Sequence, residues 1–152
     1  MMAAKESTIH ASAVLIGAKA ALIRGPAGSG KSRLVWDLLT AASQGGLPFS
    51  RLVADDRACV ESHSGQLLVR PAQALAGLIE VHGLGIRRIE FEAVAVVGLI
   101  VDLAAADAGR YPEPKAASAS IAGVALPRLA VAAGMSALPM VLARLRSSPA
   151  GD

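Results

Sequence analysis

The sequence predicts an α/β fold, a P-loop-containing mixed sheet with packed helices, and three observations favour this class. An apolar segment at residues 20–23 leads into a glycine-rich loop, and apolar residues at helical spacing follow that loop. Residues 94–103 form a long apolar stretch that we expect to be a central strand. Shorter apolar runs elsewhere are separated by turn residues. A chain of 152 residues is long enough to bury a core, so we predict a single domain over 1–152, with frayed ends at 1–8 and 147–152.

The first elements are a β-hairpin, a helix and a short strand. Two apolar runs at 11–16 and 20–24 are separated by a three-residue turn that contains glycine, which is typical of a hairpin. A helix is expected over 31–43, because the sequence Gln-Gly-Gly-Leu-Pro that follows is a helix stop. Trp36, at helical spacing within it, is expected to pack in the interior. A strand at 51–54 comes next.

The remaining elements follow from the same signals. We predict a hairpin at 58–61 and 66–70, a helical turn at 72–76, two strand fragments within 78–89, a surface loop at 104–118, a β-segment at 121–131 broken by Pro127, and a last helix that ends near 146. Ser136 is the expected N-cap of that last helix. Pro139 then falls in its first turn, where a missing N–H costs little.

The loop after the second strand matches the phosphate-binding pattern G-x-x-x-x-G-K-[ST]. Glycines let backbone N–H groups converge on a phosphate without a Cβ in the way, and the N-terminus of the next helix adds positive potential. We expect Lys31 to reach the terminal phosphates and Ser32 to ligate Mg²⁺. The alternative is a glycine-rich turn with an incidental Lys-Ser pair, which the flanking strand and helix disfavour. The predicted nucleotide-binding residues are Gly25, Pro26, Ala27, Gly28, Ser29, Gly30, Lys31 and Ser32.

Phosphoryl transfer also needs carboxylates for the metal and for the nucleophile, and the sequence offers two sets. Asp102 ends the predicted central strand, where many ATPases carry an acidic residue. Alternatively, Asp55 and Asp56 end a shorter strand, and Glu80 follows in a glycine-flanked segment. Adjacent strand residues point to opposite faces, so one of the paired aspartates can face the metal or nucleophile while the other takes a structural hydrogen bond. A solvated turn is the alternative interpretation of this Asp-Asp pair.

Composition limits the partners and the compartment. The net charge is +3, but no run of Lys and Arg is interleaved with aromatic residues, so nucleic-acid binding is not expected. The single Cys59 cannot form an internal disulfide, which fits a reducing cytoplasm. The N-terminus lacks the apolar region of a signal peptide, and the longest apolar run, 93–101, is too short to cross a bilayer. We therefore expect a cytoplasmic protein without a membrane span.

Three motifs resemble, in order, those of the HPr kinase/phosphorylase family. They are His10 followed by the P-loop, the sequence Leu-Val-Ala-Asp-Asp-Arg at 52–57, and Ile-Glu-Val-His-Gly-Leu-Gly-Ile at 79–86. The last is similar to the family signature, usually I/L-E-I-R-G-L-G-I. The resemblance covers residues 9 to about 131, the family's catalytic domain, and looks like the short form known from alphaproteobacteria, without the separate N-terminal domain. It implies a fold similar to the nucleotide core of phosphoenolpyruvate carboxykinases.

This resemblance implies a kinase that uses ATP and Mg²⁺ to phosphorylate a serine of the phosphocarrier protein HPr, within phosphotransferase-system regulation. Asp56 would accept the proton of the serine hydroxyl, and His10 and Lys31 would complete the phosphate site. Arg110 matches an active-site arginine. Many members also run the reverse phosphorolysis, and full-length members form hexamers, so a homo-oligomer is expected.

The resemblance also selects between the two sets of carboxylates. It implies that Glu80 ligates Mg²⁺ together with Ser32. The motif at 52–57 adds Asp55 to the expected metal ligands. Asp102 falls where the family has no catalytic residue, so we expect its likeness to the acidic residue of an ordinary ATPase to be accidental.

Three departures from the family pattern qualify this assignment. His82 replaces the signature arginine, exchanging a permanent cation for a group that titrates near neutrality. Residues 90–93 replace a longer loop that engages the protein substrate, and 132–135 replace a basic stretch associated with the phosphorylase reaction. We therefore expect the kinase direction rather than the phosphorylase direction. Two alternatives stay open: an ATP-binding regulatory module of the same fold with weak or no kinase activity, and a small-molecule P-loop kinase.

Overall fold

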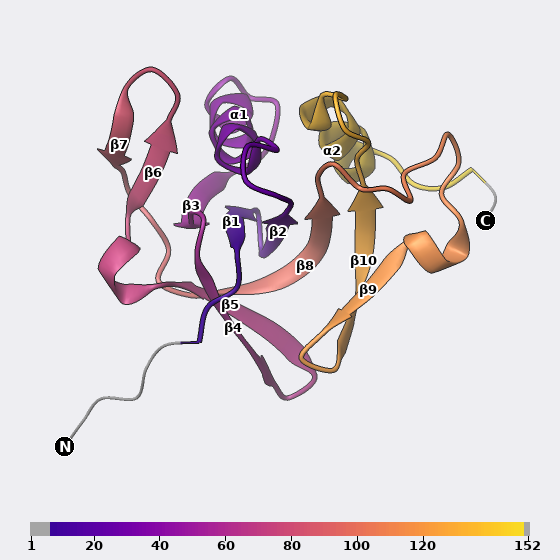
Figure 1. The fold of residues 1–152 in the computed structure, drawn as a ribbon, viewed down its shortest axis with the longest axis horizontal. Helices are drawn as coiled ribbons and strands as arrows, with labels where there is room; N and C mark the ends of the chain where they lie inside the picture. Colours follow the sequence, from indigo (N-terminus) through magenta and orange to yellow (C-terminus); the bar gives the residue numbers. More distant parts are fainter. Residues whose placement is uncertain (1–6, 151–152) are drawn as a thin grey trace.

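The computed structural model describes residues 7–150 and has the predicted α/β architecture (Figure 1). The helices in this range are α1 (Lys31–Ser43) and α2 (Ala137–Arg146), and two short 3-10 turns are η1 (Gln73–Leu75) and η2 (Pro114–Ala116). The strands are β1 (Ala11–Ile16), β2 (Lys19–Arg24), β3 (Ser50–Ala54), β4 (Ala58–His63), β5 (Gln66–Pro71), β6 (Leu78–Val81), β7 (Gly85–Arg88), β8 (Ala95–Asp102), β9 (Ser118–Ile121) and β10 (Val124–Ala130).

Most predicted elements are present close to their expected bounds. The hairpin β1–β2, the helix α1, the hairpin β4–β5 and the strand β8 are confirmed. Residues 7–8 and 147–150 lie outside helices and strands, and the other residues expected to be frayed, 1–6 and 151–152, lie outside the described residues. None of the helices in the described range has the length and apolar character that crossing a bilayer requires.

The expectation that Pro127 breaks a strand is wrong, because it lies inside β10. The N–H of the next residue, Arg128, donates to the carbonyl of Ala117 on the β9 side, so the nitrogen of Pro127 faces the opposite side. Strand β8 lies on that opposite side, and the pairing of β10 with β8 begins only at Arg128. The missing N–H of the proline therefore costs no hydrogen bond to β8.

The main sheet is mixed, with the strand order β3-β1-β2-β8-β10-β9, and β5 joins β8 to the hairpin partner β4. Strand β8 is parallel to both β2 and β10, whereas β1 is antiparallel to β2 and to β3. The carboxyl ends of β2, β3, β8 and β10 therefore meet at one edge, together with the start of β1. Ligands of open α/β sheets bind at such an edge.

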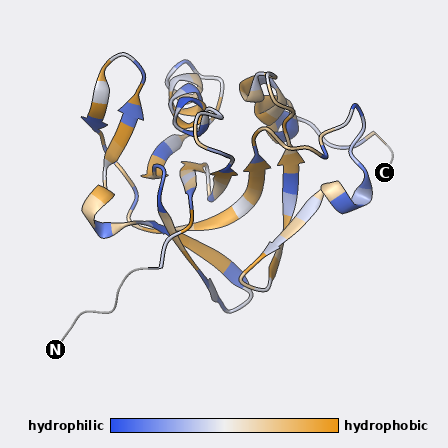
Figure 2. Cartoon of the chain, viewed as in Figure 1, coloured by the Kyte–Doolittle hydropathy of each residue, from blue (hydrophilic) through white to orange (hydrophobic). Residues whose placement is uncertain are grey.

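Both faces of the central strands are buried, so two apolar clusters flank the sheet. One cluster packs α1 and α2 on the sheet, and its members include Ile23, Leu38, Val101 and Val141. The other lies between the sheet and the β4–β5 hairpin, and its members include Leu22 and Leu67. Strand β8 is hydrophobic over most of its length (Figure 2), and its buried residues divide between the two clusters, with Leu99 and Val101 in the first and Val97 and Ile100 in the second. The alternation of Leu22 and Ile23 explains why β2 is a continuous apolar run.

The small antiparallel sheet β6–β7 stands apart from the main sheet, beside α1 (Figure 1). Ile79 of β6 is buried in the helix-side cluster and anchors the hairpin there. Glu80, the next residue, is exposed on the other side of the strand. This hairpin therefore brings the signature-like segment to the edge where the P-loop lies.

Candidate active site

The P-loop connects β2 to α1 and follows the expected strand, loop and helix order. Gly28 and Gly30 have φ values of 81° and 101°, a left-handed conformation that residues with a Cβ rarely adopt. A Cβ on Gly25 would lie 2.5 Å from the Ser29 Oγ and 3.1 Å from the Leu103 Cβ. The glycines are therefore required by backbone conformation at two positions and by close packing at the third.

Lys31 lies inside the loop rather than extending into solvent. Lys31 is 6% exposed, and its ammonium donates to the carbonyls of Gly25 at 2.9 Å and Pro26 at 3.2 Å. Both partners are neutral carbonyls, and no carboxylate within residues 7–150 pairs with this ammonium. A phosphate bound in the loop would supply an anionic partner.

Asp55 is a buried carboxylate, 7% exposed, that joins three elements of the site. It accepts hydrogen bonds from the Ser32 hydroxyl at 2.7 and 2.9 Å, from the Ser12 hydroxyl at 2.9 Å, and from the Glu80 backbone N–H at 3.0 Å. The P-loop, β1 and β6 therefore converge on one carboxylate, and none of these donors carries a positive charge.

Asp56 points to the other side, as expected for adjacent residues. Its carboxylate lies 2.6 Å from the Nε2 of His10, and the two side chains are 57% and 38% exposed. Its φ of 68° is left-handed, which is uncommon outside glycine although aspartate tolerates it better than most residues. Strained conformations of this kind cluster at functional sites. The pair is therefore accessible and held in a specific orientation.

A cavity of about 710 Å³ brings most of the predicted residues together, and we call it the Asp56 cavity. It is lined by His10, Lys31, Ser32, Asp56 and Glu80, with His82 and Trp36 at its wall. Trp36 is 41% exposed, so the expectation that it packs in the interior is wrong. It lies on the solvent side of α1, because the apolar stripe of that helix is formed by Leu34, Val35 and Leu38.

A second cavity, of about 630 Å³, lies on the other side of the P-loop, and we call it the Met135 cavity. The two cavities share five lining residues, which are Ala27, Gly28, Gly30, Arg33 and Asp37. The far wall of the Met135 cavity is the segment after β10, which contributes Val131, Ala133 and Met135 among others. Apart from Arg33 and Asp37, its lining residues carry no ionisable side chain, whereas the Asp56 cavity adds those of His10, Lys31, Asp56, Glu80 and His82.

Arg110 is placed away from these residues. It lies in the segment between β8 and β9, and its guanidinium stacks over the ring of its neighbour Tyr111 at 5.5 Å. Within residues 7–150, it lines neither the Asp56 cavity nor the Met135 cavity. The structure therefore brings His10, Asp56 and the P-loop together, but does not bring Arg110 to them.

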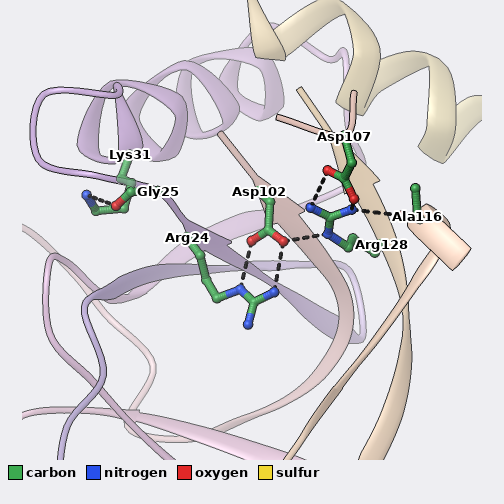
Figure 3. A network of polar contacts seen from close by, with 7 residues as sticks. All are labelled: Arg24, Gly25, Lys31, Asp102, Asp107, Ala116 and Arg128. Carbon is green, nitrogen blue, oxygen red and sulfur yellow. Dashed lines mark hydrogen bonds and ion pairs between the residues drawn. The ribbon is translucent and has the colours of Figure 1, made fainter. Parts of the chain in front are cut away.

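Asp102 ends β8 beside the P-loop strand, and its carboxylate is paired with two arginines (Figure 3). It accepts from Arg24 at 2.7 and 2.8 Å and from Arg128 at 2.5 Å. Burial raises the pKa of Asp102, but the hydrogen bonds and charges of these arginines outweigh burial and hold the pKa below its usual value. Arg128 also binds Asp107 and the carbonyl of Ala116, which fastens the segment after β8 to β10.

Ser12 is the site residue that the sequence analysis missed. Its side chain is fully buried in β1, and its hydroxyl lies between Asp55 and the backbone of Asp56. A signal for it exists, because Ser12 is the only polar residue in the strand Ala-Ser-Ala-Val-Leu-Ile. A buried polar side chain requires a partner, and the unmatched hydroxyl in this strand could have predicted one.

Ser32, Asp55 and Glu80 offer oxygen ligands of the type that Mg²⁺ prefers. Within the described range, no group of three or more His, Cys, Asp or Glu side chains forms a metal cage. Mg²⁺ in kinases is held by one or two carboxylates together with substrate phosphates and water. The two carboxylates and the hydroxyl beside the phosphate-binding loop therefore fit that ion.

Comparison with known proteins identifies a structural neighbour. No family model matches the sequence, and no curated protein does. The structure is similar to that of the HPr(Ser) kinase/phosphatase from Coxiella burnetii, with a TM-score of 0.72, over 93% of this chain and 89% of that chain. The two sequences are 21% identical. The chain therefore has the fold of an HPr(Ser) kinase/phosphatase, which confirms, at the level of the fold, the resemblance seen in its three motifs.

Proposed function

We propose that this protein is an ATP-dependent kinase that phosphorylates a serine of an HPr-type phosphocarrier protein. The observation that carries the proposal is the Asp56 cavity, where the P-loop residues Lys31 and Ser32 face the His10–Asp56 pair and Glu80. A cavity that joins a phosphate-binding loop to an accessible carboxylate has the parts that phosphoryl transfer requires. The shared fold with an HPr(Ser) kinase/phosphatase supports the choice of substrate.

In this proposal the phosphates lie along the P-loop and the nucleoside lies in the Met135 cavity. The cavities share loop residues, so a nucleotide can extend from one into the other. Lys31 would exchange its carbonyl partners for phosphate oxygens. Ser32, Asp55 and Glu80 would hold Mg²⁺, which neutralises charge on the phosphates when bound.

Asp56 is the proposed proton acceptor. As the serine oxygen forms its bond to the γ-phosphorus, the bond from that phosphorus to the β-phosphate oxygen breaks and ADP leaves. The proton of the serine hydroxyl passes to the Asp56 carboxylate, which is exposed and within the cavity. His10, hydrogen-bonded to the same carboxylate, orients it. Arg110 is proposed to act in this reaction only if the segment that carries it approaches the cavity.

The test is transfer of label from γ-labelled ATP, with Mg²⁺, to HPr of the same organism. We expect label on wild-type HPr and none on an HPr variant that lacks the acceptor serine. Asp56→Asn should lower the transfer rate at least about a hundredfold, as loss of a general base does, and should still bind ATP. Wild-type protein that binds ATP but transfers no label would contradict the proposal and favour a regulatory binding module. Label transferred to a small molecule instead would favour a small-molecule kinase.

The remaining parts of the proposal concern the compartment, the oligomeric state and the reverse reaction. We propose a cytoplasmic homo-oligomer, by analogy with the hexamers of the family, and light scattering coupled to gel filtration measures its mass. The phosphorylase direction is measured by adding inorganic phosphate to phosphorylated HPr and following pyrophosphate. We expect little pyrophosphate, because residues 132–135 are not basic.

A further inference from the structure

We infer that Ser12 is a positioning residue that fixes both aspartates of the site, an inference that rests on the proposed function. Ser12 has no exposed surface. Its hydroxyl donates to the Asp55 Oδ1 at 2.9 Å and accepts from the backbone N–H of Asp56 at 3.0 Å. One buried hydroxyl thus connects two adjacent residues whose side chains have different proposed roles.

The first role of Ser12 concerns the backbone of Asp56. Three consecutive residues hold Asp56: the His10 ring contacts its carboxylate, the Ala11 N–H donates to its carbonyl at 3.1 Å, and the Ser12 hydroxyl accepts from its N–H. A φ of 68° is unfavourable for a residue with a Cβ and persists only when its surroundings fix it. A substitution at Ser12 removes this one hydrogen bond and leaves the chemical groups of Asp56 and His10 themselves unaltered.

The second role concerns the orientation of the Asp55 carboxylate. Its Oδ1 accepts from both Ser12 and Ser32, while its Oδ2 accepts from Ser32 and from the backbone N–H of Glu80. Ser12 lies in β1, whereas the other donors to this carboxylate lie in the P-loop motif and in β6. Without the hydrogen bond from Ser12, the carboxylate keeps only the contacts to the two elements that also meet the nucleotide in the proposed function.

Loss of the Ser12 hydroxyl should therefore affect transfer more than nucleotide binding. It would leave the Asp56 N–H without its partner, and Asp56 could relax toward an ordinary φ, which turns the carboxylate away from the incoming serine. Displacements of about 1 Å reduce enzymatic rates up to about a hundredfold. The P-loop contacts of Lys31 do not involve Ser12, so nucleotide affinity should be kept.

The experiment compares four variants of the full chain in the HPr transfer assay and in binding of ADP without Mg²⁺. Ser12→Ala should lower kcat by about tenfold or more with an unchanged Kd for metal-free ADP. Ser12→Thr keeps the hydroxyl and should restore most of kcat. Ser12→Cys replaces the hydroxyl with a somewhat larger thiol that hydrogen-bonds only weakly, and its kcat should lie between those of the other two variants. Val14→Ala, buried in the same strand within the helix-side cluster, should lower Tm but not kcat.

The outcomes separate this inference from the proposed function. A wild-type kcat in Ser12→Ala would overturn the inference alone. Equal losses in Ser12→Thr and Ser12→Ala, or a loss of kcat in Val14→Ala as large as in Ser12→Ala, would also overturn it, since packing would then explain the effect. A parallel loss of affinity for ADP measured without Mg²⁺ would contradict the positioning role, since the P-loop contacts would then be disturbed as well. Wild-type protein without any transfer would overturn the proposed function, and this inference with it.

Discussion

Two carboxylates lie at strand ends on the same edge of the sheet, with β1 and β2 between their strands, and their hydrogen-bond partners differ in charge. Asp102 at the end of β8 is bound by the two arginines Arg24 and Arg128. Asp55, directly after β3, is bound by hydroxyls of Ser12 and Ser32 and by one backbone N–H. The donors to the first carboxylate are permanent cations, whereas the donors to the second are neutral and include the P-loop residue Ser32.

The comparison shows that position at a strand end does not define a metal ligand. Asp102 occupies the position that an ordinary ATPase uses, but binding Mg²⁺ there would require breaking charge-assisted bonds to Arg24 and Arg128. Asp55 needs only to exchange neutral donors for the ion. Charge compensation around each carboxylate therefore separates the structural aspartate from the candidate metal ligand.

The largest effect is expected for Asp55→Asn. We expect transfer to HPr to fall at least about a hundredfold, because the proposed Mg²⁺ site loses a charge, and the Mg²⁺ concentration needed for half-maximal rate to rise. Transfer rates across a Mg²⁺ titration measure both effects. A variant with wild-type rates and an unchanged Mg²⁺ requirement would place Asp55 outside the metal site.

The matched change, Asp102→Asn, should act on stability instead. It removes the carboxylate partner of Arg24 and one of the two carboxylate partners of Arg128, and we expect a loss of about 2 kcal/mol in the free energy of unfolding. This is less than for a fully buried pair, because the Arg24 side chain is 34% exposed. Urea denaturation measures the loss. Transfer per folded molecule should stay close to wild type, and a collapse of transfer in folded Asp102→Asn would contradict the assignment.

A smaller effect is expected in the pH dependence of stability. The folded pKa of Asp102 lies below its usual value, so its stabilising contribution is complete above the unfolded pKa and is lost as the pH falls through the folded pKa. The stability difference between wild type and Asp102→Asn should therefore be constant above about pH 5 and shrink below about pH 4. Urea titrations across this range measure it. A difference that grows on acidification would contradict the depressed pKa.

Much of the fold could be predicted because local signals agree with the tertiary structure. The β1–β2 hairpin, the P-loop and α1 carry strong apolar periodicity and glycine markers within a short span, and all three are confirmed. The position of Pro127 could not be judged locally, because its tolerance depends on where pairing with β8 begins. Trp36 was misjudged for the same reason: helical spacing alone does not tell which face meets the sheet.

The candidate site was predicted from motifs, but its connections were not. Proximity of His10 to Asp56, 46 residues apart, follows from pairing of β1 with β3. The arginine partners of Asp102 lie on strands that flank β8 but are far from it in the sequence, and no local pattern predicts them. Those partners decide the role of a carboxylate, so sequence patterns identified the candidates and the structure distinguished them.

The left-handed backbone of Asp56 has a consequence for sequence variation at this position. Glycine and asparagine also tolerate this conformation, so a library screened only for folded protein should be enriched in aspartate, asparagine and glycine at position 56. A library screened for phosphoryl transfer should retain aspartate alone. The difference in residue frequencies at position 56 between the two libraries would show how much more strictly phosphoryl transfer restricts this position than folding does.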